Sequence, residues 1–148
     1  MIKVSTSTTI ARPADQVFAY LADVTKQPEW EPTVLACRLN SSEPMREGST
    51  ATQTMKDKES KRDVTLTVAE YEVGRRIQFE KQWPYPISFG WVIEPNGSGT
   101  QVTYLVELGV QGMMRALLSV MRVLSALGLK TPIHRDLNNI KKRIEESN

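Results

Sequence analysis

The sequence predicts one α+β domain, in which a curved antiparallel sheet of about seven strands wraps around a long C-terminal helix. Two short helices are expected after the first strand. Short segments between residues 33 and 108 alternate apolar and polar residues, as half-buried strands do. From residue 112 onward the apolar residues recur at helical spacing. The length of 148 residues suits a single domain, 1–148.

The N-terminal region predicts a strand followed by short helices. Residues 2–10 are rich in Val, Ile and Thr, which favours a strand. Pro13 suits the start of a helix, because the first helical position needs no N–H group. The apolar residues of 17–21 then fall on one helical face. A second short helix is expected over 25–30, interrupted near Pro28.

The middle of the chain predicts an antiparallel meander. The clearest alternation is Val64, Leu66 and Val68 against intervening threonines. Asn96-Gly97 is a strong hairpin signal, because both residues tolerate positive φ. The expected strands cover residues 33–39, 48–55, 64–68, 77–80, 89–93 and 102–108.

The C-terminal region predicts two helical segments separated by Pro132. The first is apolar except for a narrow polar stripe formed by Arg115, Ser119, Arg122 and Ser125. The second has one apolar face formed by Ile133, Leu137, Ile140 and Ile144. Both segments are expected to cover the sheet.

Composition excludes several classes of protein. Lys and Arg number 19 against 17 Asp and Glu, and this balance argues against a nucleic-acid partner. Cys37 and His134 are the single cysteine and the single histidine, too few for the usual zinc sites. We expect no metal and no cofactor.

The sequence also predicts a soluble, cytoplasmic protein. The N-terminus has no apolar core of signal-peptide length. The apolar region 113–129 is interrupted by Arg115 and Arg122, which argues against a transmembrane span. A single cysteine suits a reducing compartment.

Several segments resemble one known superfamily. They are residues 10–23, Pro28-Glu29-Trp30, 68–77, 94–103 and 137–145. Together they resemble the START-like helix-grip superfamily (SRPBCC), most closely its polyketide cyclase/dehydrase type, over essentially the whole chain. The resemblance implies the helix-grip fold. Because members include cyclases, lipid carriers and hormone receptors, it does not fix an activity.

A strongly bent sheet can leave a cavity beneath its helix, and we expect a hydrophobic small molecule there, lipid-, polyketide- or isoprenoid-like. The alternative is that the same apolar side chains simply fill the core. Tyr104, with Tyr71 or Arg62, would orient a polar end of the ligand. The expected lining is Trp30, Leu66, Phe79, Trp83, Phe89, Trp91, Tyr104, Met113, Leu117 and Met121.

No convincing catalytic constellation is evident in the sequence. His134 is expected on the surface, without a visible partner base. Glu70 and Glu72 lie opposite the alternation of their apolar neighbours, and no carboxylate is expected on the inward face. Cys37 is expected to behave as a small buried hydrophobe. A carrier is therefore favoured over a cyclase or dehydrase, and an interaction domain with a collapsed cavity is the third alternative.

The C-terminal region also differs in charge from the rest of the chain. Residues 111–148 contain 7 Lys or Arg and 3 Asp or Glu, a net charge of +4. An apolar helix with a basic end could make transient contact with an anionic membrane surface. It could instead bury its apolar face in the sheet, with any surplus at a dimer interface. Monomer and homodimer both remain open.

Overall fold

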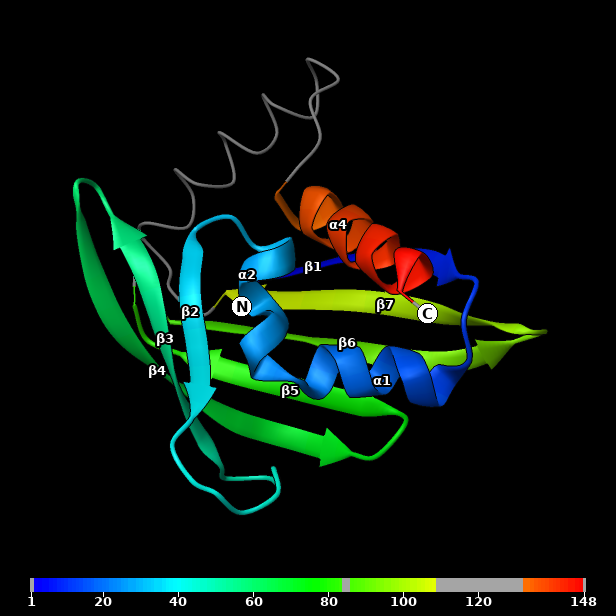
Figure 1. The fold of residues 1–148 in the computed structure, drawn as a ribbon, viewed down its shortest axis with the longest axis horizontal. Coiled ribbons are helices and arrows are strands. Elements are labelled where there is room, and N and C mark those ends of the chain that lie inside the picture. Colours follow the sequence, from blue (N-terminus) through cyan, green and yellow to red (C-terminus); the bar gives the residue numbers. More distant parts are fainter. Residues whose placement is uncertain (1, 84–85, 109–131, 148) are drawn as a thin grey trace.

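The computed structural model describes residues 2–83, 86–108 and 132–147, which form a seven-stranded antiparallel sheet with helices over one face (Figure 1). The elements in chain order are β1 (Ile2–Ile10), α1 (Ala14–Ala22), the 3-10 helix η1 (Val24–Lys26), α2 (Gln27–Trp30), β2 (Val34–Leu39), β3 (Thr50–Asp57), β4 (Ser60–Glu72), β5 (Arg76–Lys81), β6 (Ile87–Asn96), β7 (Gly99–Leu108) and α4 (Pro132–Glu146).

The expected strands are all present, and most of them extend beyond the ranges that the alternation indicates. β3 continues to Asp57 and β4 begins at Ser60, so only two residues form the turn between them. Lys58 makes this turn possible by adopting a φ of 57°. The short turn keeps the polar ends of both strands in the ladder, which the polar sequence itself does not indicate.

The strand order is β1-β7-β6-β5-β4-β3-β2, so the first and last strands of the chain are neighbours. All other neighbours are consecutive, as expected for a meander. The Asn96-Gly97 turn joins β6 to β7, with Gly97 at a φ of 64°, which confirms the hairpin prediction. Register irregularities in β2 and β4 are β-bulge positions, and bulges bend strands.

Gly90 permits a close approach between β5 and β6 in the middle of the sheet. A Cβ atom at this position would lie 2.1 Å from the carbonyl oxygen of Ile77. Any side chain would therefore force the two strands apart. Gly90 lies between the aromatic residues Phe89 and Trp91, so the sheet geometry beneath these rings depends on it.

The short helices lie over the sheet as predicted. α1 buries Val17, Phe18 and Leu21. The expected interruption near Pro28 is present as the change from η1, which ends at Lys26, to α2, which begins at Gln27. Pro28 lies in the first turn of α2, where its missing N–H costs nothing.

α4 begins at Pro132 and buries the predicted apolar face against the sheet. Its C-terminal end is fastened to the link between β1 and α1. Arg12 donates to the backbone carbonyls of Glu145 and Ser147, and the Ala11 N–H donates to the Glu145 carboxylate at 2.8 Å. The predicted polar stripe at 115–125 lies outside the described residues.

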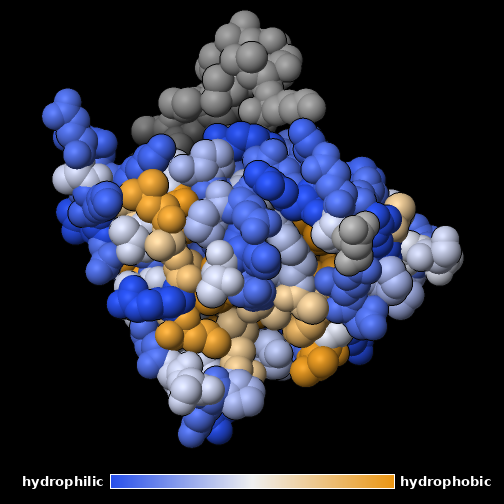
Figure 2. Space-filling view, in the orientation of Figure 1, coloured by the Kyte–Doolittle hydropathy of each residue, from blue (hydrophilic) through white to orange (hydrophobic). Residues whose placement is uncertain are grey.

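Figure 2 shows that the helical face is mainly hydrophilic, with separate hydrophobic spots instead of one continuous apolar area. Val73, with 80% of its surface exposed, is the most exposed large apolar residue of the described part. Within the described ranges, no helix is both long enough and apolar enough to cross a membrane.

Candidate functional site

Five aromatic rings meet in the interior between the sheet and the helices. This aromatic cluster consists of Trp30, Phe79, Phe89, Trp91 and Tyr104. Trp91 stacks on Tyr104 with ring centroids 5.2 Å apart, and the ring of Trp30 meets Trp91 edge-on at 5.4 Å. Both geometries are favourable for aromatic pairs. The cluster therefore joins α2 to the three strands β5, β6 and β7.

The register of the sheet explains why these rings meet. Trp91 on β6 is directly opposite Tyr104 on β7, and Phe89 is directly opposite Phe79 on β5. Residues two apart on a strand share a face, so all four rings point inward. Trp91, at the centre, has none of its surface exposed.

The predicted lining residues separate into three groups in the structure. Six are buried in the core: Trp30, Leu66, Phe79, Phe89, Trp91 and Tyr104. Trp83 is only partly buried, and the guanidinium of Arg62 lies over its ring at 4.8 Å from the centroid. Met113, Leu117 and Met121 lie outside the described residues.

A buried line of three polar side chains runs beside the aromatic cluster. This amine line consists of Lys81 at the end of β5, Gln53 on β3 and Gln27 at the start of α2. The Lys81 ammonium donates to Gln53 Oε1 at 2.9 Å, and Gln53 Nε2 donates to Gln27 Oε1 at 2.7 Å. Gln27 Nε2 is buried and has no acceptor among the described residues.

Lys81 has apolar surroundings. It is only 9% exposed, its Nζ lies 3.4 Å from the Met55 sulfur, and the Phe89 ring centroid is 5.6 Å away. Among the residues described, no carboxylate forms an ion pair with it. Burial lowers the pKa of Lys81 to about 8, while the nearby Glu31 carboxylate and Cys37 thiol oppose this shift.

The amine line was not predicted from the sequence, although strand parity indicates it. Lys81 has the same parity as the inward-facing Ile77 and Phe79 of its strand. Gln53 likewise has the parity of the buried Ala51 and Met55. Polar residues at inward positions are the informative exceptions in an alternating strand.

A second polar cluster links α2 to α4. This carboxyl pair consists of Glu31 and Asp136, whose side chains are hydrogen-bonded to each other. Glu31 also accepts from the Thr33 N–H at 3.0 Å and from its hydroxyl at 2.8 Å. Arg135 lies 3.5 Å from Glu31 and 3.2 Å from Asp136. Both carboxyl groups of this cluster therefore have a hydrogen-bond donor or a cation beside them.

The carboxyl pair retains one proton, and that proton belongs to Asp136. Burial and the adjacent Glu31 raise the pKa of Asp136 to about 8. Burial also opposes ionisation of Glu31, but hydrogen bonds from Asp136 and Thr33 keep its pKa below the usual value. At neutral pH a protonated Asp136 thus donates to an ionised Glu31.

The expectation that no carboxylate lies inward is wrong for α4. Asp136 is 3% exposed. It lies three residues after Ile133 and four before Ile140, both buried, so helical spacing places it on the apolar face. Its polar character alone made it look like a surface residue.

The other predicted polar groups have different environments. Burial and the negative charges of Asp136 and Glu31 raise the pKa of Tyr104, so its hydroxyl stays neutral in the interior. Tyr71 packs against Phe18 at a ring distance of 5.6 Å. Arg62 is exposed and paired with Asp57 at 3.2 Å, so it does not reach the interior.

The remaining chemical candidates do not join the site. Cys37 is buried, and burial raises the pKa of its thiol to about 12, which leaves it a poor nucleophile. His134 is exposed on α4. Glu70 is exposed and paired with Arg76 at 3.1 Å. No group of three potential metal ligands occurs in the part of the chain that the structure describes.

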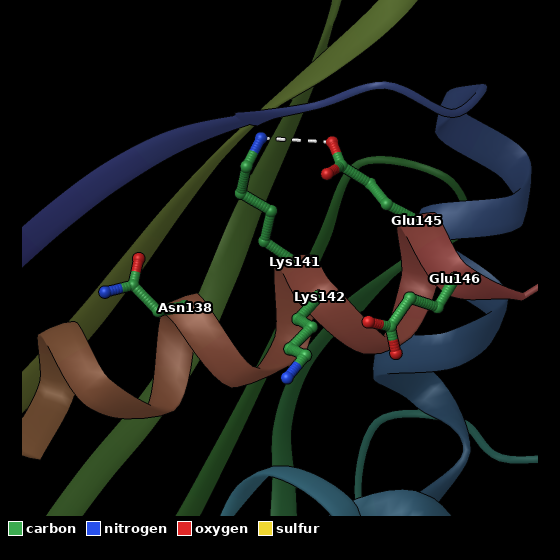
Figure 3. Close-up of a pocket in the computed structure, with 5 residues that line it drawn as sticks. All are labelled: Asn138, Lys141, Lys142, Glu145 and Glu146. Atoms are coloured by element: carbon green, nitrogen blue, oxygen red, sulfur yellow. Dashed lines mark hydrogen bonds and ion pairs between the residues drawn. The ribbon is translucent and has the colours of Figure 1, made fainter.

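A surface pocket of about 280 Å³ lies along the outside of α4 (Figure 3). Its lining is polar: Asn138, Lys141, Lys142, Glu145 and Glu146. The Lys141 ammonium forms an ion pair with Glu145 at 3.0 Å. Lys141 and Glu145 reach back to the Thr9 carbonyl and the Ala11 N–H, whereas Asn138, Lys142 and Glu146 are exposed. This polar and charged lining makes the pocket unsuited to a hydrophobic molecule.

Solved structures with the same fold are numerous but distant in sequence. The Zhui aromatase/cyclase from Streptomyces sp. R1128 is 16% identical, covering 97% of this chain and 93% of that one, with a TM-score of 0.66. The Polyketide_cyc-like protein Cgl2372 from Corynebacterium glutamicum is 22% identical, covering 97% and 91%, with a TM-score of 0.68. The di-domain ARO/CYC StfQ from the steffimycin biosynthetic pathway is 17% identical, with a TM-score of 0.73, and its match covers 98% of this chain and 51% of StfQ. These likenesses confirm the helix-grip fold.

No curated protein matches the sequence significantly. A family described as "Polyketide cyclase / dehydrase and lipid transport" matches residues 1–145. That description supports a role in hydrophobic ligand binding or in cyclase chemistry without specifying which. The chain belongs to the polyketide cyclase/dehydrase and lipid transport family, as its resemblance to the helix-grip superfamily predicts.

Proposed function

We propose that this protein binds a hydrophobic small molecule between the sheet and the helices, against the aromatic cluster. Stacked and edge-on rings offer a wide apolar surface, the kind of wall that small-molecule sites use. The supporting observation is Trp91 Nε1, a fully buried N–H with no acceptor among the described residues. Ordinary cores pair nearly all of their buried polar groups. An acceptor atom of a ligand would satisfy this donor.

The first experiment is native mass spectrometry of the purified protein, with solvent extraction of the same sample. A reproducible extra mass that extracts as an apolar compound supports the proposal and gives the ligand class. The second is titration with N-phenyl-1-naphthylamine, a neutral aromatic dye. Because Trp30 and Trp91 belong to the aromatic cluster, bound dye should quench tryptophan emission with saturable, equimolar stoichiometry. Absence of both the extra mass and saturable dye binding would overturn the proposal.

Truncation of Trp91 is a poor test, although it looks attractive from sequence. Trp91 is fully buried and contacts four other rings, so Trp91→Ala is expected to cost about 3–5 kcal/mol of stability. Trp91→Phe keeps an aromatic ring and removes the unpaired N–H. This variant should fold, bind the neutral dye within about threefold of the wild type, and lose affinity for ligands with an acceptor group.

A second candidate function is a dehydrase or cyclase, and Asp136 is the observation that favours it. A carboxyl group that is still protonated at neutral pH can act as a general acid. In a dehydration, Asp136 would give its proton to a departing hydroxyl group. The neutral amine form of Lys81 would take the proton from the adjacent carbon, so that an enone and water result.

This second function has a direct test with 4-hydroxy-4-phenylbutan-2-one, a β-hydroxyketone whose enone product absorbs in the near ultraviolet. The wild type should accelerate formation of the enone above the buffer rate. Asp136→Asn should abolish the acceleration while leaving dye binding unchanged. Equal rates with and without protein, together with intact dye binding, would favour the carrier.

A further inference from the structure

We propose that the bound molecule carries an anionic oxygen, such as a carboxylate or an enolate, and that Lys81 binds this oxygen. The inference rests on the proposed ligand-binding function and names the chemical class of its ligand. Two observations support it. The amine line has more hydrogen-bond donors than acceptors, and its Lys81 ammonium has no counterion among the described residues.

Lys81 has more donors than its surroundings use. An ammonium group has three N–H donors and no acceptor. One donor goes to Gln53 Oε1 at 2.9 Å, and a second faces the Met55 sulfur at 3.4 Å, a weak acceptor. No third acceptor for this ammonium lies within the described ranges. A position for one strong acceptor therefore remains at the Lys81 end.

The other end of the amine line also has surplus donors. Both side-chain carbonyl oxygens are already engaged, Gln53 Oε1 by Lys81 and Gln27 Oε1 by Gln53. Gln27 Nε2 keeps two N–H groups without an acceptor in the described structure. The amine line is thus rich in donors and poor in acceptors. A polar group complementary to it must accept hydrogen bonds, which excludes ligands whose polar end is an ammonium group.

The charge of Lys81 further restricts the chemical class of the ligand. A buried ammonium without a counterion is costly, and the face of Phe89 compensates for only part of that cost. Glu31 is the acidic group whose charge acts on Lys81, but it forms no ion pair with it and is bound by Asp136 and Thr33. An anionic oxygen from a ligand would provide the missing charge. Hydrogen bonds between two charged groups are about twice as strong as neutral ones.

The experiment compares two dyes that share one aromatic skeleton. N-phenyl-1-naphthylamine is neutral, whereas 1-anilinonaphthalene-8-sulfonate adds one anionic group. Lys81→Met keeps a similar length and removes the charge, and Lys142→Met is the matched control on the exposed side of α4. Lys81→Met should weaken the sulfonate dye about tenfold or more and the neutral dye less than about threefold. Lys142→Met should leave both affinities unchanged.

A second measurement keeps Lys81 in place and so does not depend on how Lys81→Met folds. The groups that face Lys81 are Gln53 and Met55 from β3, Cys37 from β2 and Glu31 after α2. Cys37 remains neutral and Glu31 remains ionised between about pH 7 and pH 9.5. Lys81, with a pKa of about 8, loses its charge in this range. Asp136 gains a negative charge over the same range, so the titration is also made with Asp136→Asn, in which this charge is absent. In both proteins the affinity for the sulfonate dye should fall relative to the neutral dye as the pH rises.

The outcomes separate this inference from the proposed function. Binding of the neutral dye, with a sulfonate affinity that neither Lys81→Met nor pH changes, would overturn the role of Lys81 alone. An equal loss in Lys142→Met would assign the effect to surface charge and would also overturn it. Failure of both dyes to bind would overturn the ligand-binding function and this inference with it.

Discussion

The two buried polar clusters lie in the same interior but differ in how completely their groups are paired. In the carboxyl pair, the Glu31 oxygens accept from Thr33 and Asp136, and Glu31 also forms an ion pair with Arg135. In the amine line, donors remain unused at both ends, on Lys81 and on Gln27 Nε2. Both clusters shift the pKa of a group to about 8, so electrostatics alone does not distinguish them.

This difference separates a structural role from a recognition role. A polar cluster that satisfies its own groups can hold two helices together without further help. A cluster with unpaired buried donors is unfavourable by itself and becomes favourable when an acceptor arrives. If the protein is a carrier, we therefore assign the carboxyl pair to fastening α2 to α4, and we expect the amine line to lower stability in the absence of a ligand.

Among the tests of this comparison, the largest expected effect comes from breaking the carboxyl pair, whose groups are all paired. Glu31→Ala removes the acceptor of two Thr33 hydrogen bonds, the partner of Asp136 and one ion pair of Arg135. We expect a loss of about 2–3 kcal/mol in the free energy of unfolding, measured by urea denaturation. Glu43→Ala is the control, because Glu43 is exposed and pairs only with Arg46 at 3.6 Å. Equal stability of the two variants would contradict a fastening role for the carboxyl pair.

The pH dependence of stability separates the two clusters next. Asp136 binds its proton more tightly in the folded state than in the unfolded state, so stability should fall as the pH rises from about 5 to about 8. Lys81 binds its proton less tightly when folded, so stability should rise from about pH 8 to about pH 9. Above about pH 9 the Cys37 thiol, whose pKa is raised in the folded state, opposes this rise. Thermal melts of the wild type should therefore show a minimum near pH 8.

Two variants show which residue causes the fall and which causes the rise of stability in this pH profile. Asp136→Asn should flatten the fall below about pH 8, and Lys81→Met should flatten the rise above it. Lys81→Met should also be at least as stable as the wild type at about pH 7, because it removes an unpaired buried charge. A marked loss of stability in Lys81→Met would mean that the amine line is structural, like the carboxyl pair.

The two clusters also show what the sequence could and could not predict. The strands, the hairpin at Asn96-Gly97 and the apolar face of α4 follow from periodicity, because burial of apolar surface imposes it. Lys81, Gln53 and Asp136 occupy inward positions of the same patterns, and only their polarity hid them. Their partners come from distant elements, so neither the pairing of Glu31 with Asp136 nor the unpaired state of Gln27 could be predicted from spacing.

The aromatic cluster marks a different limit of sequence reasoning. Strand parity correctly predicts that Phe79, Phe89, Trp91 and Tyr104 point inward. A packed core and the wall of a ligand site both need large apolar side chains at these positions, so the sequence pattern does not distinguish them. The unpaired Trp91 N–H favours the interpretation as a ligand site. It arises from three-dimensional packing, which no local sequence pattern encodes.

The smallest expected effect concerns the neutral hydrogen bond that accompanies the carboxyl pair. Asn139 Nδ2 on α4 donates to the backbone carbonyl of Trp30 at 3.1 Å, so it also links α4 to α2. Asn138 is its exposed neighbour on the same helix. Asn→Ala raises helix propensity equally at both positions, so the difference between the two variants isolates the hydrogen bond. We expect Asn139→Ala to be about 1 kcal/mol less stable than Asn138→Ala in urea denaturation. If this difference in the free energy of unfolding were as large as the loss in Glu31→Ala, a neutral hydrogen bond would link α2 to α4 as strongly as the carboxyl pair does. The carboxyl pair would then not be the main connection between the two helices.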